Sequence, residues 1–133
     1  MYYFERRTFV EKSEIKEFEN RYKIKLPKAY LEFIQTVGSY SIFMDKYKLG
    51  IKIFSPNEIK EFSDKVFNGT GVDLFPDLLI IGSTSTAQCG FDLKQPANNF
   101  SVFYSDIPPE NWLEDSKFEE FEEWIDMIVS GDF

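Results

Sequence analysis

Leu78-Leu79-Ile80-Ile81, inside the segment Phe75-Pro76-Asp77-Leu78-Leu79-Ile80-Ile81-Gly82, is an uninterrupted aliphatic run. A run of this length is too short for a helix, and it is too apolar for a strand at the edge of a sheet. We therefore predict that it forms a central strand.

Further strands are expected on both sides of this run. Downstream, residues 91–94 and 100–104 have the composition of two strands, joined across the turn-forming segment Gln95-Pro96-Ala97-Asn98-Asn99. Upstream, residues 40–54 alternate irregularly between apolar and polar side chains, which predicts a hairpin or two short strands. Together these segments make one sheet.

Three helices are expected in the first half of the chain. Ser13 is a good N-cap for the first, whose apolar residues recur three and four apart through Tyr22. Pro27 stands at the first position of the second, and Gly38 supplies a left-handed stop after it. Ser55-Pro56-Asn57-Glu58 combines an N-cap, a first-turn proline and a capping-box glutamate, so a third helix should follow.

The last helix is predicted to open with the capping box Ser116…Glu119 and to stop at Gly131. The chain is thus predicted as one domain, residues 1–133, of the α+β class, with a single mixed or antiparallel sheet and helices packed on it. The apolar stripe of the last helix consists of Phe118, Phe121, Trp124, Ile125, Ile128 and Val129. The arc opposite is acidic and consists of Glu119, Glu120, Glu123 and Asp126.

The composition removes most catalytic and metal-binding chemistry. With no histidine and one cysteine, the chain has no Ser-His-Asp or Cys-His nucleophile system and no histidine or thiolate zinc site. No GxGxxG or GxxxxGK[ST] string is present. Carboxylate-pair chemistry is not excluded, because 23 acidic residues offer many pairs. We therefore expect a protein that is not an enzyme and that needs no cofactor or metal.

The net charge of −8 is concentrated at one end of the chain. Residues 106–133 carry ten acidic side chains against Lys117 alone, whereas residues 1–105 carry 14 basic and 13 acidic side chains. A field of this sign repels phosphate backbones and anionic lipid and attracts basic proteins. We therefore expect a basic protein as the partner, rather than nucleic acid or a membrane.

The sequence also favours the cytoplasm. The N-terminal segment Met1-Tyr2-Tyr3-Phe4-Glu5-Arg6-Arg7 lacks an apolar stretch of the about 7–15 residues that a signal peptide requires. No apolar run approaches the roughly 18–20 residues of a membrane span. A single cysteine, Cys89, cannot form an internal disulfide, which fits a reducing compartment.

Several motifs occur in an order that resembles the SUKH superfamily, which includes a yeast regulator of cell-wall synthesis and many bacterial immunity proteins. The first is Leu26-Pro27-x-x-Tyr30-x-x-Phe33-Ile34-x-x-Val37-Gly38, after a helix that carries Phe18-Glu19. The likeness continues through residues 75–82, Gly90-Phe91-Asp92-Leu93 and Val102-Phe103-Tyr104, and it closes with the apolar stripe of the terminal helix.

This resemblance implies a non-enzymatic immunity protein. Such a protein is a cytosolic partner that binds and blocks a polymorphic or contact-dependent toxin, often a nuclease. The resemblance carries over no active site, because binding surfaces vary from member to member, and it specifies no oligomeric state. A regulatory or scaffold module, as in the yeast branch, is the alternative.

Two interpretations of the acidic C-terminal region remain open. Its acids either meet the basic substrate groove of a toxin, or they form a solvated surface that keeps the domain soluble. Two aromatic residues nearby are candidate interface anchors, of which Trp112 alternatively packs over the sheet edge as a lid. The candidate protein-binding residues are Tyr104, Asp106, Trp112, Glu114, Asp115, Glu119, Glu120, Glu123 and Asp126.

Overall fold

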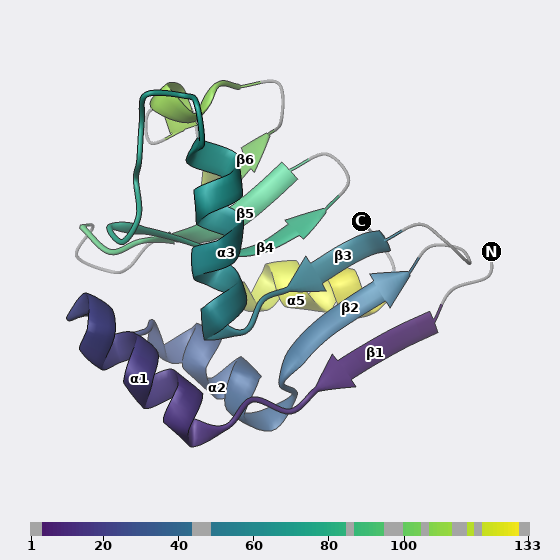
Figure 1. Cartoon of the computed structure of the whole chain (residues 1–133). Helices are drawn as coiled ribbons and strands as arrows, with labels where there is room; N and C mark the ends of the chain where they lie inside the picture. Colours follow the sequence, from purple (N-terminus) through teal and green to yellow (C-terminus); the bar gives the residue numbers. More distant parts are fainter. Residues whose placement is uncertain are drawn as a thin grey trace.

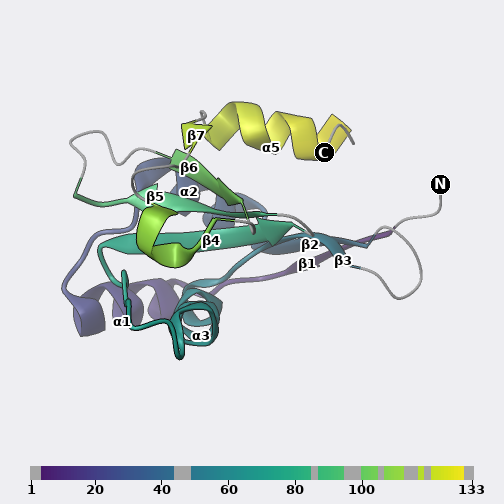
Figure 2. The same cartoon turned by 90° about the horizontal axis from the view of Figure 1, so that it is seen from above.

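The described part of the chain folds around an antiparallel sheet of seven strands, which lie side by side in sequence order. Figure 1 labels β1 to β6, and Figure 2 also labels β7. The computed structural model describes residues 4–43, 49–84, 87–94, 100–104, 107–112, 117–118 and 121–130. The predicted α+β class with a single sheet is confirmed, and every strand pairing is antiparallel. The strands are β1 (Phe4–Thr8), β2 (Ser39–Phe43), β3 (Leu49–Ile53), β4 (Leu78–Thr84), β5 (Ala87–Asp92), β6 (Phe100–Tyr104) and β7 (Lys117–Phe118).

Helices cover both faces of this sheet (Figure 2). α1 (Lys12–Tyr22) and α3 (Pro56–Phe67) lie on one face. α5 (Phe121–Ser130) lies on the other face, and α2 (Lys28–Thr36) is beside it. A short 3-10 helix, η1 (Pro109–Asn111), follows β6.

The predicted central strand is confirmed. β4 lies between β3 and β5, in the middle of the described sheet. Its first four residues, Leu78 to Ile81, are each at most 1% exposed. Burying one Leu or Ile side chain stabilises a fold by about 1.5–3 kcal/mol, so β4 is a principal contributor to the core.

The local signals at two helix ends are also confirmed. The Glu58 N–H donates to the Ser55 hydroxyl over 3.4 Å, and the Ser55 N–H donates to the Glu58 carboxylate over 3.0 Å, which is the reciprocal capping box expected before α3. Burial opposes ionisation of Glu58, but its hydrogen bonds to Lys52 and Ser55 prevail and lower its pKa. Gly38 follows α2 with φ at +88°, the left-handed conformation expected of a helix stop.

The starts of α1 and α2 are displaced from their predicted positions. α1 begins at Lys12 with Glu11 as its N-cap, so Ser13 lies inside the first turn, where its hydroxyl donates to the Glu11 carboxylate over 3.3 Å. α2 begins at Lys28, with Pro27 as its N-cap rather than as its first helical residue. Neither N-cap residue caps its helix with a side-chain hydrogen bond, so neither helix start carries the Ser, Thr, Asp or Asn signal that a sequence pattern would reveal.

Two strand segments lie outside the predicted ones. β1 pairs only with β2 among the described strands, and its residues Glu5 to Thr8 are exposed, so no apolar alternation marks it. β5 spans residues 87–92 instead of 91–94. Gly90 interrupts the apolar pattern of this strand. The position requires glycine, because a Cβ there would lie 2.1 Å from the carbonyl oxygen of Leu79.

The predicted start of the last helix is wrong. Lys117 and Phe118 form β7, which pairs with Val102 and Ser101 of β6, and α5 begins at Phe121. Phe118 therefore belongs to a strand and not to the apolar stripe of the helix. Pairing with β6 gives hydrogen-bond partners to backbone N–H and C=O groups at the edge of that strand. The free energy gained by this long-range pairing outweighs the local preference of a capping-box sequence for a helix start.

The remainder of the predicted stripe agrees with the structure where it is described. Phe121 and Trp124 are buried, and Ile125 packs partly buried against the core. Several predicted features of this helix lie outside the described residues or side chains: Ser116, Glu119, Ile128, Val129 and Gly131.

One hydrogen bond anchors the segment that joins α1 to α2, and a second one anchors α2 itself. The Leu26 N–H donates to the carboxylate of Glu19 over 2.8 Å. The hydroxyl of Tyr30 donates to the carbonyl of Phe54 over 2.5 Å and so ties α2 to the end of β3. Burial raises the pKa of Tyr30 well above its usual value, which keeps this hydroxyl protonated as a donor. Glu19 and Tyr30, two residues of the resemblance motif, therefore serve the fold.

Replacing Tyr30 by phenylalanine is expected to lower the free energy of unfolding by about 1–3 kcal/mol, because the buried Phe54 carbonyl loses its donor. Urea unfolding measures the change. Tyr22→Phe is the matched control, since Tyr22 is only half-buried and its change should stay within about 0.5 kcal/mol. Equal effects of the two substitutions would contradict a structural role for the Tyr30 hydroxyl.

Candidate protein-binding surface

The structure describes only part of the predicted binding surface. Glu123 and Asp126 are exposed on α5, on the side opposite its buried Phe121 and Trp124, as the helical arc predicted. Tyr104 is the last residue of β6. The other acidic candidates, Asp106, Glu114, Asp115, Glu119 and Glu120, lie outside the described residues.

Trp112 is part of the core and corresponds to the lid alternative. It is 3% exposed, and its indole stacks on Phe103 of β6 with ring centroids 5.2 Å apart. The indole N–H donates to the carbonyl of Ile107 over 2.8 Å, and Phe67 at the end of α3 contacts the same ring. A ring held in this way fixes the η1 segment against the sheet and is not accessible as an interface anchor in this conformation.

A groove of about 520 Å³ runs between α2 and α5. Three carboxylates line it: Glu32 from α2, and Glu122 and Asp126 from α5. All three residues are exposed, and none of the residues that line the groove is basic. We call this feature the α2–α5 groove.

The floor of the α2–α5 groove is apolar. Phe33 of α2 and Phe121 of α5 meet edge to face, with ring centroids 6.1 Å apart, and this contact holds the two helices side by side. Ile125 and Ala29 extend the apolar surface along the two helices. The groove therefore presents an apolar base between carboxylates that come from both walls.

Glu32 was not among the predicted binding residues. It precedes the acidic C-terminal region by most of the chain, and only the packing of α2 against α5 brings it to Asp126 and Glu122. Lys28 approaches the Glu32 carboxylate at 4.0 Å, but both side chains are largely exposed. An exposed pair at that distance contributes about 0–1 kcal/mol, so Lys28 holds Glu32 only weakly.

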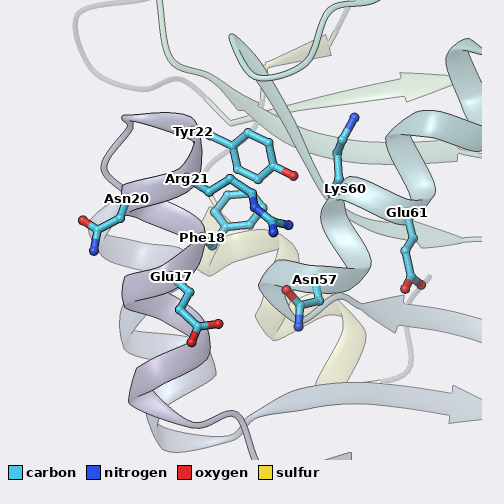
Figure 3. A pocket seen from close by; sticks show the side chains of 8 residues that line it. All are labelled: Glu17, Phe18, Asn20, Arg21, Tyr22, Asn57, Lys60 and Glu61. Atoms are coloured by element: carbon cyan, nitrogen blue, oxygen red, sulfur yellow. The ribbon is translucent and has the colours of Figure 1, made fainter.

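A second groove, between α1 and α3, has mixed charge (Figure 3). Arg21 and Lys60 line it together with Glu17 and Glu61, and Figure 3 shows Arg21 extending from α1 into the space between the helices. A hydrogen bond with the Asp64 carboxylate, 2.6 Å away, raises the pKa of Lys60. Such a balanced set of charges produces no field of one sign.

A third groove lies where β1, β2 and β3 meet the first turns of α1 and α3. Arg6 and Lys52 line it opposite Glu14 and Glu58, and Lys52 lies 2.5 Å from the Glu58 carboxylate. Its charges are thus also balanced. Of these three grooves within the described part of the chain, the α2–α5 groove is the one that carries a single sign of charge.

Among the described residues, no group of three or more His, Cys, Asp or Glu side chains is placed to hold a metal ion. No helix in the described ranges is long and apolar enough to span a membrane. Cys89, in β5, is 1% exposed.

The comparison with known families confirms the resemblance. The SMI1 / KNR4 family (SUKH-1) matches residues 10–127, and the chain belongs to this family. It is also similar to the immunity protein RhsIB of Dickeya dadantii (strain 3937), with 36% identity over 133 residues. That match covers 96% of this chain and 79% of RhsIB. No solved structure matches the chain.

Proposed function

We propose that this protein is an immunity protein, which binds a cognate toxin domain and neutralises it without catalysing a reaction. The observation that carries the proposal is the 36% identity to an immunity protein across nearly the whole chain. Membership of the SUKH-1 family, whose match covers residues 10–127, supports it. The protein acts in the cytoplasm, where an incoming toxin would meet its target.

The partner in this proposal is a basic toxin domain of the nuclease type. The support is electrostatic: residues 106–133 carry ten acidic side chains against one basic one, and Glu123 and Asp126 are exposed on α5. A nuclease binds phosphates with a basic groove, and an acidic surface complements that groove. The same field disfavours nucleic acid and anionic membranes as direct ligands of this protein.

The proposal is tested by co-expression with a candidate toxin domain, which is sought among the products of the genes adjacent to the gene of this protein. Cells that express the toxin domain alone should stop growing, and co-expression of this protein should restore growth. The two proteins should also co-purify as one complex. Growth arrest that persists despite equal amounts of folded protein would reject the function, and co-purification without protection would instead favour a regulatory module.

Association with the toxin is expected to slow as salt rises. The Debye length falls from about 8 Å near 0.15 M to about 3 Å at 1 M, which screens attraction between an acidic surface and a basic partner. Complementary fields raise association rates by about 10–10³-fold, so most of that gain should disappear across this range. Stopped-flow mixing at several salt concentrations measures the rate. A rate that stays constant would show that the acidic residues do not steer the encounter.

A further inference from the structure

We infer that the α2–α5 groove receives a segment of the toxin domain in which arginine side chains alternate with large apolar ones. The inference rests on the proposed function and deepens it, because it locates the contact and states the chemistry of the segment bound there. It also extends the binding surface beyond the acidic C-terminal region to α2.

The first support is the distribution of charge around the groove. Glu32 on one wall faces Glu122 and Asp126 on the other, and no basic side chain lines the space between them. Carboxylates that share a groove repel one another, and a cation placed between them relieves this repulsion. An anionic or neutral segment leaves it in place, so charge complementarity selects a cationic occupant.

The second support is the apolar floor. Phe33 and Ile125 are half-buried, so part of their surface stays open to solvent within the groove. Covering this apolar surface with a partner is favourable. A surface that served only to keep the protein soluble would not need exposed apolar side chains. The occupant therefore carries apolar side chains as well as cations.

The third support concerns the choice between arginine and lysine. A guanidinium donates to a carboxylate in a bidentate arrangement and also stacks on aromatic rings. The groove offers both partners within one space, since the half-buried Phe33 lies on α2 next to the exposed Glu32. Arginine satisfies both kinds of surface, whereas the ammonium group of lysine is more strongly hydrated.

The test uses a short capped peptide of alternating arginine and leucine as the probe. The isotope-labelled full chain is titrated with this peptide, and backbone amide shifts are followed by nuclear magnetic resonance. Two further peptides separate the contributions: one replaces arginine with glutamate, and the other replaces leucine with serine. Shift changes are expected along α2 and α5 with the arginine–leucine peptide, and both replacement peptides should bind more weakly.

Charge-reversal variants locate the site. The double variant Glu122→Lys with Asp126→Lys should weaken binding of the arginine–leucine peptide by about tenfold or more, because two attractive contacts become repulsive. The matched control, Glu17→Lys with Glu61→Lys, changes the net charge equally at two exposed acids on α1 and α3, outside this groove. It should weaken binding by no more than about twofold. Both variants should keep the melting temperature of the parent.

Three outcomes would overturn the inference. The first is the absence of peptide binding, or shift changes away from α2 and α5. The second is equal weakening by the two double variants, which would leave only net charge as the cause. The third is binding of the arginine–serine peptide as tight as that of the arginine–leucine peptide, which would show that the apolar floor does not contribute to binding. None of these affects protection of cells by the parent protein, so the proposed function stands or falls separately.

Discussion

Replacing Gly38 by alanine is expected to lower the free energy of unfolding by about 2–5 kcal/mol. Gly38 has φ at +88°, a conformation that costs a residue with a Cβ about 1–2 kcal/mol. An added Cβ would also lie 2.2 Å from the carbonyl oxygen of Thr8. That atom belongs to the backbone of β1 and cannot rotate away, so β1 must shift, with an overpacking cost of about 1–3 kcal/mol.

Gly69 provides the matched control for this prediction. It has φ at +77°, yet a Cβ built on it meets nothing within 4 Å. Gly69→Ala should therefore show only the conformational cost, about 1–2 kcal/mol. Urea unfolding of both variants measures the difference between them, which reports the contact with β1. Identical losses for Gly38→Ala and Gly69→Ala would show that β1 adjusts without cost.

The Gly38 prediction depends on a left-handed backbone conformation and on a close contact with Thr8, and only the first of these can be predicted from the sequence. The left-handed conformation could be predicted, because a glycine at the end of an apolar helical pattern is a local signal. The contact with Thr8 could not, because β1 is a charged edge strand without the alternation that marks a half-buried strand. Local geometry was thus recoverable, and its tertiary environment was not.

The same distinction explains the rest of the fold. The capping box of Ser55 and Glu58 and the apolar run from Leu78 to Ile81 are encoded within a few residues, and both were predicted correctly. The start of α5 was not predicted correctly, because Lys117 and Phe118 form β7 by pairing with β6. No sequence pattern within residues 116–119 indicates this pairing. Strand pairing between distant segments depends on the whole fold.

The candidate surface also has one part that the sequence predicts and one part that depends on packing between distant segments. The exposure of Glu123 and Asp126 follows from helical periodicity, so the polar side of α5 was predictable. The α2–α5 groove was not, because Glu32 and Phe33 join it through the packing of α2 against α5. For Trp112 the sequence left two alternatives, an interface anchor or a lid over the sheet edge, and the ring that is buried on Phe103 corresponds to the lid.

Replacing Phe121 by alanine is expected to lower the free energy of unfolding by about 3–5 kcal/mol. Phe121 is 7% exposed, and its ring lies 5.3 Å from Phe100 and 5.6 Å from Phe91, measured between centroids. It also meets Phe33 of α2, so its removal leaves a cavity where the sheet, α2 and α5 converge. Urea unfolding measures the loss, and a change below about 1 kcal/mol would contradict this packing role.

The comparison of Phe121→Ala with the charge-reversal pair Glu122→Lys and Asp126→Lys separates folding from binding on one helix. The charged pair is exposed, so its effect on the free energy of unfolding should stay within about 0.5 kcal/mol for each substitution. If the α2–α5 groove binds the toxin, the charged pair keeps the parent melting temperature yet fails to protect cells.

Phe121→Ala fails in proportion to the fraction that is unfolded, because domains are stable by only about 5–15 kcal/mol. Lowering the growth temperature should therefore restore protection to Phe121→Ala and not to the charged pair. Rescue of both variants by cooling would assign both losses to folding, and the acids of α5 would then be a solvated surface.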